Sequence, residues 1–320
     1  MNPQLAVMAS IRGGVFTRAD ARACGYADTD IDALLRSGQW RRIRRGTYAA
    51  RRSLMLVTDE ILHLRRAYRV LRASGPDVFA SHQSAAALHA LPVWGLDLAR
   101  VHVTAPDGCS GRLRGVHRHI RDPVGPGLQL WNTLRMVSPA RAIVEVAATA
   151  PALPAVVLAD AAVHTGMVDR RALRQASTFL DHGNKRALKV LDQLTGAASI
   201  AESRLRHILA DAGLPAPSPT PPPDTGQPDP DDPAAEALWF PDERTVVEFE
   251  PRFPFYSEDS GPEDPPTEPA DDDGPQPVEH CWISWTDLDD PTTVADRIRT
   301  TFTRAARRTG IRHFDLARVR

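Results

Sequence analysis

The chain has 320 residues, 42% of them hydrophobic, and its 39 basic and 40 acidic residues give a net charge of −1. This length predicts two or three domains with ordinary hydrophobic cores. No run of about 18 apolar residues occurs, which excludes a transmembrane helix. The first residues, MNPQLAVMAS, contain neither a basic leader nor an apolar segment, so we expect no secretion signal and a cytoplasmic location. Three scattered cysteines, Cys24, Cys109 and Cys281, exclude a disulfide framework and a cysteine-based zinc site.

Charge is divided unevenly along the chain. Residues 1–223 hold 29 basic and 17 acidic residues, residues 224–290 hold 2 and 21, and residues 291–320 hold 8 and 2. The three parts therefore carry +12, −19 and +6. A basic segment attracts a polyanion and an acidic segment repels one, so the first part favours DNA as a partner.

Residues 1–52 show the element order of a winged helix-turn-helix. A first helix is expected over 2–12, and a second over 18–24, capped by Thr17 and ended by Gly25. Asp28 or Thr29 is expected to cap a third helix, in which apolar residues at 31, 34 and 35 form one helical stripe and which Gly38 ends. Residues 40–43 and 47–49 then form a hairpin around a turn at 44–46. In such a fold the helix before the hairpin enters the major groove and the wing contacts phosphates.

Arginines concentrate on the predicted hairpin, where four of them fall within five positions. They predict phosphate binding by the wing, and a winged helix that binds only protein is the alternative. Acidic residues at 28, 30 and 32 argue against base reading by the preceding helix, since phosphates repel them. The candidate DNA-binding residues are Arg18, Arg36, Arg41, Arg42, Arg44 and Arg45.

Residues 53–197 predict a mixed α/β domain in which we see no catalytic motif. Helices are expected over 59–73, 81–91, 140–148, 154–165 and 170–180, and strands over 99–104, 114–120 and 131–137. In the first of these helices the core-facing residues are expected to be Ile61, Leu62, Leu64, Tyr68 and Leu71. His82 and His89 share a helix face but lie seven residues apart, too far for a typical metal pair, so no metal role is expected. His117, Arg118, His119 and Arg121 form a candidate anion-binding cluster.

Three stretches, GQWRRIRRGTYAA, SHQSAAALHALPVW and VHVTAP, resemble the AbiEi-type antitoxins of type IV toxin–antitoxin systems. The resemblance covers about residues 5–180, and its best motifs lie before residue 105. It implies a transcriptional regulator that represses its own operon through the winged helix. It also implies a cognate nucleotidyltransferase toxin as a protein partner.

Residues 198–320 predict a third domain, with a helix over 200–212, strands over 244–250 and 280–285, and a helix over 292–306. In the first strand, the alternation places Thr245, Val247 and Phe249 on one side. Nine prolines between 215 and 233 predict an extended, disordered linker over 216–233. The acidic, proline-rich residues 256–277 are also expected to be disordered. The fold class expected for the whole chain is α+β.

The stretches ESRLRHILADAGLP, WFPDERTVVEFE and WISWTDLDDP resemble PD-(D/E)xK nucleases of the very-short-patch-repair type. The resemblance implies Glu202, Glu248 and Glu250 as catalytic acids and Glu236 and Glu248 as Mg²⁺ ligands, the metal activating water for phosphodiester cleavage.

This sequence departs from the nuclease pattern in several places. The expected aspartate falls at Ala237, the expected glycine at Pro251, and an acidic stretch over 258–274 replaces a basic helix. We therefore expect a degenerate endonuclease-like domain with no cofactor. A Mg²⁺-dependent endonuclease guided by the winged helix remains the alternative, and a third possibility is that the acidic segment competes with DNA for the basic N-terminal domain.

Overall fold

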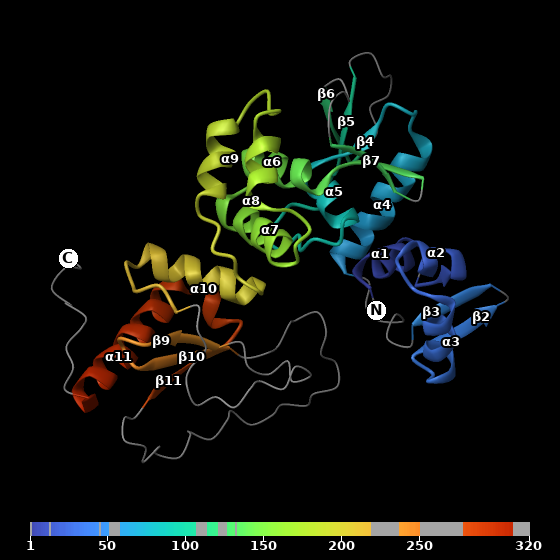
Figure 1. The fold of residues 1–320 in the computed structure, drawn as a ribbon. Coiled ribbons are helices and arrows are strands. Elements are labelled where there is room, and N and C mark those ends of the chain that lie inside the picture. Colours follow the sequence, from blue (N-terminus) through green and yellow to red (C-terminus); the bar gives the residue numbers. More distant parts are fainter. Residues whose placement is uncertain are drawn as a thin grey trace. The chain divides into compact units, whose positions relative to one another are not determined.

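The computed structural model describes residues 2–12, 14–44, 46–50, 58–106, 114–120, 127–131, 133–218, 237–249 and 278–309. Over these residues the structure combines helices with three separate β-sheets, in agreement with the expected α+β class. It divides into two units, Met1–Gly196 and Ala197–Arg320, which Figure 1 colours from blue to yellow and from yellow to red.

The first unit begins with a small three-stranded sheet and three helices. The elements follow in the order α1 (Pro3–Ile11), β1 (Phe16–Thr17), α2 (Arg18–Ala23), α3 (Asp28–Arg36), β2 (Trp40–Arg44) and β3 (Thr47–Ala50). The strand order is β1-β3-β2, and both pairings are antiparallel. The rings of Phe16, Trp40 and Tyr48 pack together with Leu5 and Ile31 to form the core of this part.

Local sequence signals account for the helix boundaries here. Thr17 caps α2 as predicted. The carboxylate of Asp20 accepts the backbone N–H of Thr17, so the two residues form a capping box. The cap of α3 is Ala27 rather than Asp28 or Thr29, because the carboxylate of Asp30 accepts the Ala27 N–H. Gly25 follows α2 with φ of +90°, a left-handed conformation that glycine adopts without strain.

A five-stranded mixed sheet forms the centre of the first unit. Its strands are β4 (Phe79–Ala80), β5 (Val101–Ala105), β6 (Val116–Ile120), β7 (Leu128–Trp131) and β8 (Leu134–Val137), in the order β6-β5-β4-β8-β7. Strands β5 and β6 are parallel, with His102 opposite His117 and Thr104 opposite His119. The single strand predicted over 131–137 is wrong, because an antiparallel hairpin of β7 and β8 occupies this region.

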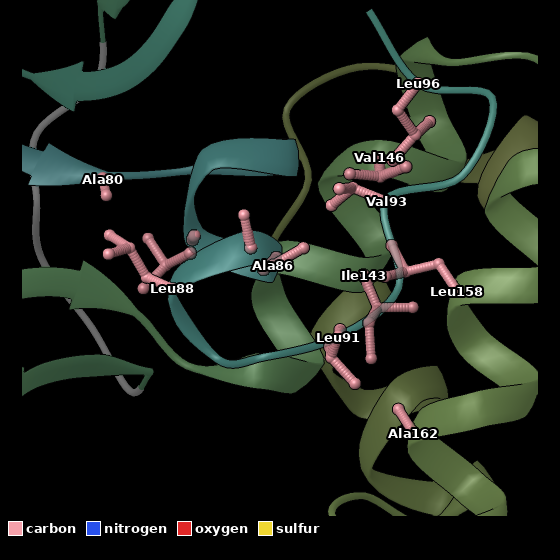
Figure 2. Close-up of a cluster of buried hydrophobic side chains, with 14 of the residues drawn as sticks. Ala80, Ala86, Leu88, Leu91, Val93, Leu96, Ile143, Val146, Leu158 and Ala162 are labelled. Carbon is pink, nitrogen blue, oxygen red and sulfur yellow. The ribbon is translucent and has the colours of Figure 1, made fainter. Parts of the chain in front are cut away.

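Helices pack against this sheet and against one another. They are α4 (Asp59–Ala73), α5 (His82–Leu88), α6 (Pro139–Thr149), α7 (Ala152–His164), α8 (Arg170–Ser177) and α9 (Asn184–Leu191), of which α9 was not predicted. Small side chains on α5 allow close contact with α6, and Figure 2 shows Ala86 and Leu91 near Ile143 and other apolar residues of this core.

The face that α4 buries differs from the predicted one at two positions. Leu62 is 41% exposed, whereas His63 is fully buried. Leu64, Ala67 and Leu71 are also buried and follow at helical spacing. The buried face of α4 therefore includes His63 in place of Leu62. The imidazole of His63 is accommodated because both ring nitrogens have partners, the carbonyl of Leu98 and the hydroxyl of Ser84.

In the described part of the second unit, two helices pack on a three-stranded sheet. Its elements are α10 (Ile200–Asp211), β9 (Ala237–Phe240), β10 (Thr245–Phe249), β11 (Glu279–Ile283), a 3-10 turn at Asp287–Asp289, and α11 (Pro291–Thr309). Strand β10 is central, antiparallel to β9 and parallel to β11. Val247 and Phe249 face the core as their alternation predicted, together with Phe240 and Phe302, whose ring centroids are 5.2 Å apart.

The predicted linker over 216–233 begins as a paired segment. The N–H of Ser218 donates to the carbonyl of Trp239 on β9 at 2.7 Å, so the expectation of disorder is wrong at this residue. Residues 219–233 and the predicted disordered stretch 256–277 lie outside the described residues. Within the described part of the chain, no helix has the length and apolar character needed to cross a membrane.

Candidate functional sites

Strands β2 and β3 place two of the predicted DNA-binding arginines on an exposed hairpin. Arg41 is paired with Ala49 and Arg42 with Tyr48, and both arginine side chains are exposed. Neighbouring strand residues point to opposite faces, so the two guanidinium groups flank the hairpin rather than forming one patch. A bulge at Ile43 ends the regular pairing and leaves this apolar side chain largely exposed near the turn.

The acidic residues of α3 are largely occupied by arginines of α2. Arg18 donates to Asp28 at 2.8 Å and also to Asp32, and Arg22 donates to Asp28 at 2.6 Å. The bond to Asp32 is the main reason that the pKa of Arg18 is raised above its ordinary value. The guanidinium of Arg18 is thus held by protein carboxylates, and its charge offsets the acidity of α3.

The other predicted arginines are placed only in part. Arg36 is exposed at the end of α3, and its Nε donates to the carbonyl of Asp32. The backbone of Arg44 belongs to β2, and Arg45 lies outside the described residues. Two acids of the predicted nuclease site, Glu236 and Glu250, lie outside them as well.

A cluster of histidines lies where α5 meets the edge of the central sheet. His82 is the first residue of α5, His102 lies on β5 and His119 on the edge strand β6. One ring nitrogen of each lies within 4.8 Å of the others, and His117 stacks on the rings of His102 and His119. In the described part of the chain, these three histidines are the only group whose geometry suits a metal ion. We call His82, His102 and His119 the histidine triad.

A buried carboxylate orients His82. Glu145 Oε2 accepts the backbone N–H of His82 at 3.1 Å and lies 3.4 Å from its Nδ1, while Glu145 Oε1 accepts from Arg141 at 2.9 Å. The hydroxyl of Ser81 also lies 3.1 Å from Nδ1. These contacts occupy Nδ1 and leave Nε2 of His82 for another partner.

The other two imidazoles face each other. Nδ1 of His102 lies 3.0 Å from Nε2 of His119, and Nε2 of His102 lies 3.0 Å from the amide nitrogen of Gln83. The ring of His119 also stacks on that of His82, with centroids 3.7 Å apart.

The triad is uncharged at neutral pH. Burial is the first cause in each case, and the neighbouring imidazoles add to it, lowering the pKa of His82 to about 2, that of His102 to about 3 and that of His119 to about 4. Uncharged imidazoles do not attract anions but are good ligands for transition metals. Of the predicted anion-binding cluster, His119 belongs to the triad and Arg118 donates to the carbonyl of Pro106, while Arg121 lies outside the described residues, so anion binding there stays a prediction.

Sequence spacing gave little indication of the triad, because its members are 17 to 37 positions apart. His89, considered beside His82 from the sequence, instead bonds through Nε2 to the carbonyl of Val137 at 2.8 Å. One signal in the sequence could have indicated the triad. Histidines lie on two successive predicted strands, at position 102 on the first and at positions 117 and 119 on the second.

The described acids of the predicted nuclease site each have a local partner. In α10, Glu202 accepts from Arg206 at 2.6 Å and from the N–H of Ala198 at 2.7 Å, while on β10 Glu248 lies 3.2 Å from His280. Among the described residues, neither acid belongs to a group that could hold a metal ion. The catalytic set with Glu250 and the metal set with Glu236 stay predictions.

Comparison with known proteins places a family match at the N-terminus. No curated protein matches the chain. Among solved structures, the chain is similar to the crystal structure of the RV2827C protein from Mycobacterium tuberculosis, with 17% identity, 62% of this chain and 78% of that chain covered, and a TM-score of 0.31. Residues 6–51 match the family model described as transcriptional regulator, AbiEi antitoxin. This match covers most of the segment from α1 to the β2–β3 hairpin and supports a regulator or antitoxin role at the family level.

Proposed function

We propose that the protein is a DNA-binding transcriptional regulator of the AbiEi antitoxin type, and that its first 50 residues form a winged helix that grips the DNA backbone. The observation that carries this proposal is the match over residues 6–51 to a regulator family, in a segment with the element order and β1-β3-β2 sheet of a winged helix. Such a regulator meets its DNA in the cytoplasm, the location that we propose.

The charge of the hairpin supports phosphate binding. Residues 1–50 contain eight arginines and four aspartates, a net charge of +4. Arg18 and Arg22 bond to acids of α3, whereas Arg41 and Arg42 form no ion pair with any described residue. A hairpin with one arginine on each face suits the minor groove, because a phosphate backbone borders that groove on both sides.

Salt dependence of DNA affinity tests this proposal directly. Each phosphate contact adds about −0.9 to the slope of log K against log salt concentration. The double variant Arg41→Ala, Arg42→Ala is expected to make the slope shallower by about 2 and to weaken binding to all duplexes alike. Fluorescence anisotropy with the protein's own promoter region and with a scrambled duplex measures both quantities.

The matched control is Arg171→Ala, an exposed arginine on α8 that lies outside the family match. This variant should keep the wild-type slope. Equal slopes for the double variant and the control, or no binding by the wild type at low salt, would show that the hairpin does not bind phosphates.

We also propose autoregulation and a cognate toxin as partner, on the basis of the family description. A reporter fused to the protein's own promoter should be repressed by the wild type and not by the double hairpin variant. A growth assay with a nucleotidyltransferase toxin encoded beside the gene tests the partner. If the double hairpin variant still restores growth, the toxin binds another surface of the protein. If the wild type does not restore growth, the proposal of a toxin partner is wrong.

A further inference from the structure

We propose that the histidine triad binds one divalent transition-metal ion, with Zn²⁺ as the best fit. The proposal is independent of DNA binding, since the triad belongs to α5, β5 and β6, which lie outside the family match over residues 6–51.

The first argument is convergence. Zn–N bonds of about 2.0–2.1 Å at tetrahedral angles place ligand nitrogens about 3.3 Å apart. In the triad one pair of nitrogens is 3.0 Å apart, and all three ligand atoms lie within 4.8 Å of one another. Side-chain rotations are therefore enough to bring the three nitrogens to bonding distance. Three histidine ligands leave the fourth position for water or a ligand, as in open zinc sites.

The second argument is the support behind His82. A metal-binding histidine usually has its other ring nitrogen bonded to a carboxylate or another fixed acceptor, which orients the ring and raises its basicity. At Nδ1 of His82 this acceptor is the hydroxyl of Ser81 at 3.1 Å, and the buried carboxylate of Glu145, held by Arg141, lies 3.4 Å from the same nitrogen. His82 also has φ of +51°, a conformation that costs a non-glycine residue free energy and that is concentrated at functional sites.

The third argument concerns how the other two rings would adapt. His102 faces His119 through Nδ1, so metal binding moves the His102 proton to Nε2. The amide of Gln83 then turns to accept this proton through its oxygen, and it gives up the bond from its nitrogen to the carbonyl of Asp97. The stack between His82 and His119 must open, because a metal bonds in the plane of an imidazole ring. His119 is the ring that can turn, since it lies half-buried on the edge strand while His82 is held by Glu145.

Zn²⁺ and Co²⁺ titrations of the full chain, freed of metal by a chelator, test the site. We expect one Zn²⁺ per chain by calorimetry and the visible absorption of tetrahedral Co²⁺. His119→Gln should weaken Zn²⁺ binding about 100-fold or more. Substituting a residue that only hydrogen-bonds to a metal ligand weakens binding about 10–100-fold, and removing a ligand itself should cost more. His164→Gln, at the exposed end of α7, is the matched control and should bind as the wild type does.

A second measurement does not depend on how the variants fold. Histidine ring resonances in the wild-type protein should respond to Zn²⁺ at the three triad residues out of 11 histidines in the chain. Equal Zn²⁺ binding by wild type and His119→Gln would overturn the proposal. So would a Zn²⁺ response confined to His207 and His280, which lie beside acids in the second unit.

Discussion

Asp160 on α7 anchors the last residues of the first unit, and its removal should be among the most costly single changes there. The carboxylate is 1% exposed. Its Oδ1 accepts the backbone N–H groups of Thr195 and Gly196, and its Oδ2 accepts the hydroxyl of Thr195, each at 2.9 Å. Asp160→Ala removes all three bonds and leaves the donors in a partly buried position.

The magnitude follows from these three bonds. A hydrogen bond to a charged group contributes about 1.5–3 kcal/mol, but bonds that share one acceptor do not add fully. We therefore expect Asp160→Ala to lower the free energy of unfolding by about 4 kcal/mol. Asp160→Asn keeps an oxygen that can accept both backbone N–H groups, so its cost should be about 1–2 kcal/mol.

Urea denaturation followed by circular dichroism measures both variants. Asp192→Ala is the matched control, because Asp192 forms an exposed ion pair with Arg174 at 2.9 Å, and such a pair contributes about 0.2–1 kcal/mol at most. Hydrogen exchange at residues 195 and 196 should rise in Asp160→Ala. If Asp160→Ala and Asp192→Ala unfold at the same urea concentration, the carboxylate does not anchor this segment.

Three further changes test other parts of the structure. Asp32→Asn removes an acid that binds Arg18, so it should tighten DNA binding and steepen the salt slope by up to about 1 in the anisotropy assay; an unchanged slope would mean that α3 lies away from phosphate. Phe302→Ala empties a buried site against Phe240 and should cost about 3–5 kcal/mol in urea denaturation, and a loss below 1 kcal/mol would contradict this packing. Burial lowers the pKa of His89 below its ordinary 6.5. As the pH falls, His89 therefore binds a proton in the unfolded chain at a higher pH than in the folded chain. The free energy of unfolding is unaffected by this group above pH 6.5, and below pH 6.5 it falls by up to about 1.4 kcal/mol per pH unit. His89→Gln should remove the contribution of His89 to the slope of unfolding free energy against pH. Equal slopes in the wild type and the variant would refute this prediction.

Short-range signals in the amino-acid sequence were enough to predict the local structure of the N-terminal domain. Thr17, Gly25 and Gly38 mark helix ends because capping and left-handed turns depend on residues within a few positions of one another. The order of helices and hairpin, and the alternation of Val247 and Phe249, could be read for the same reason. Local signals were weaker over residues 184–191, where helix α9 has no side-chain cap.

The contacts between charged and polar groups of distant segments depend instead on how the helices and strands pack. Arg18 was expected at DNA, but the packing of α2 beside α3 gives its guanidinium two carboxylates. His82, His102 and His119 come together because β5 and β6 pair in parallel and α5 begins over their edge. Strand register and helix packing depend on the whole buried core, so contacts between residues far apart in the chain cannot be derived from the spacing of those residues alone.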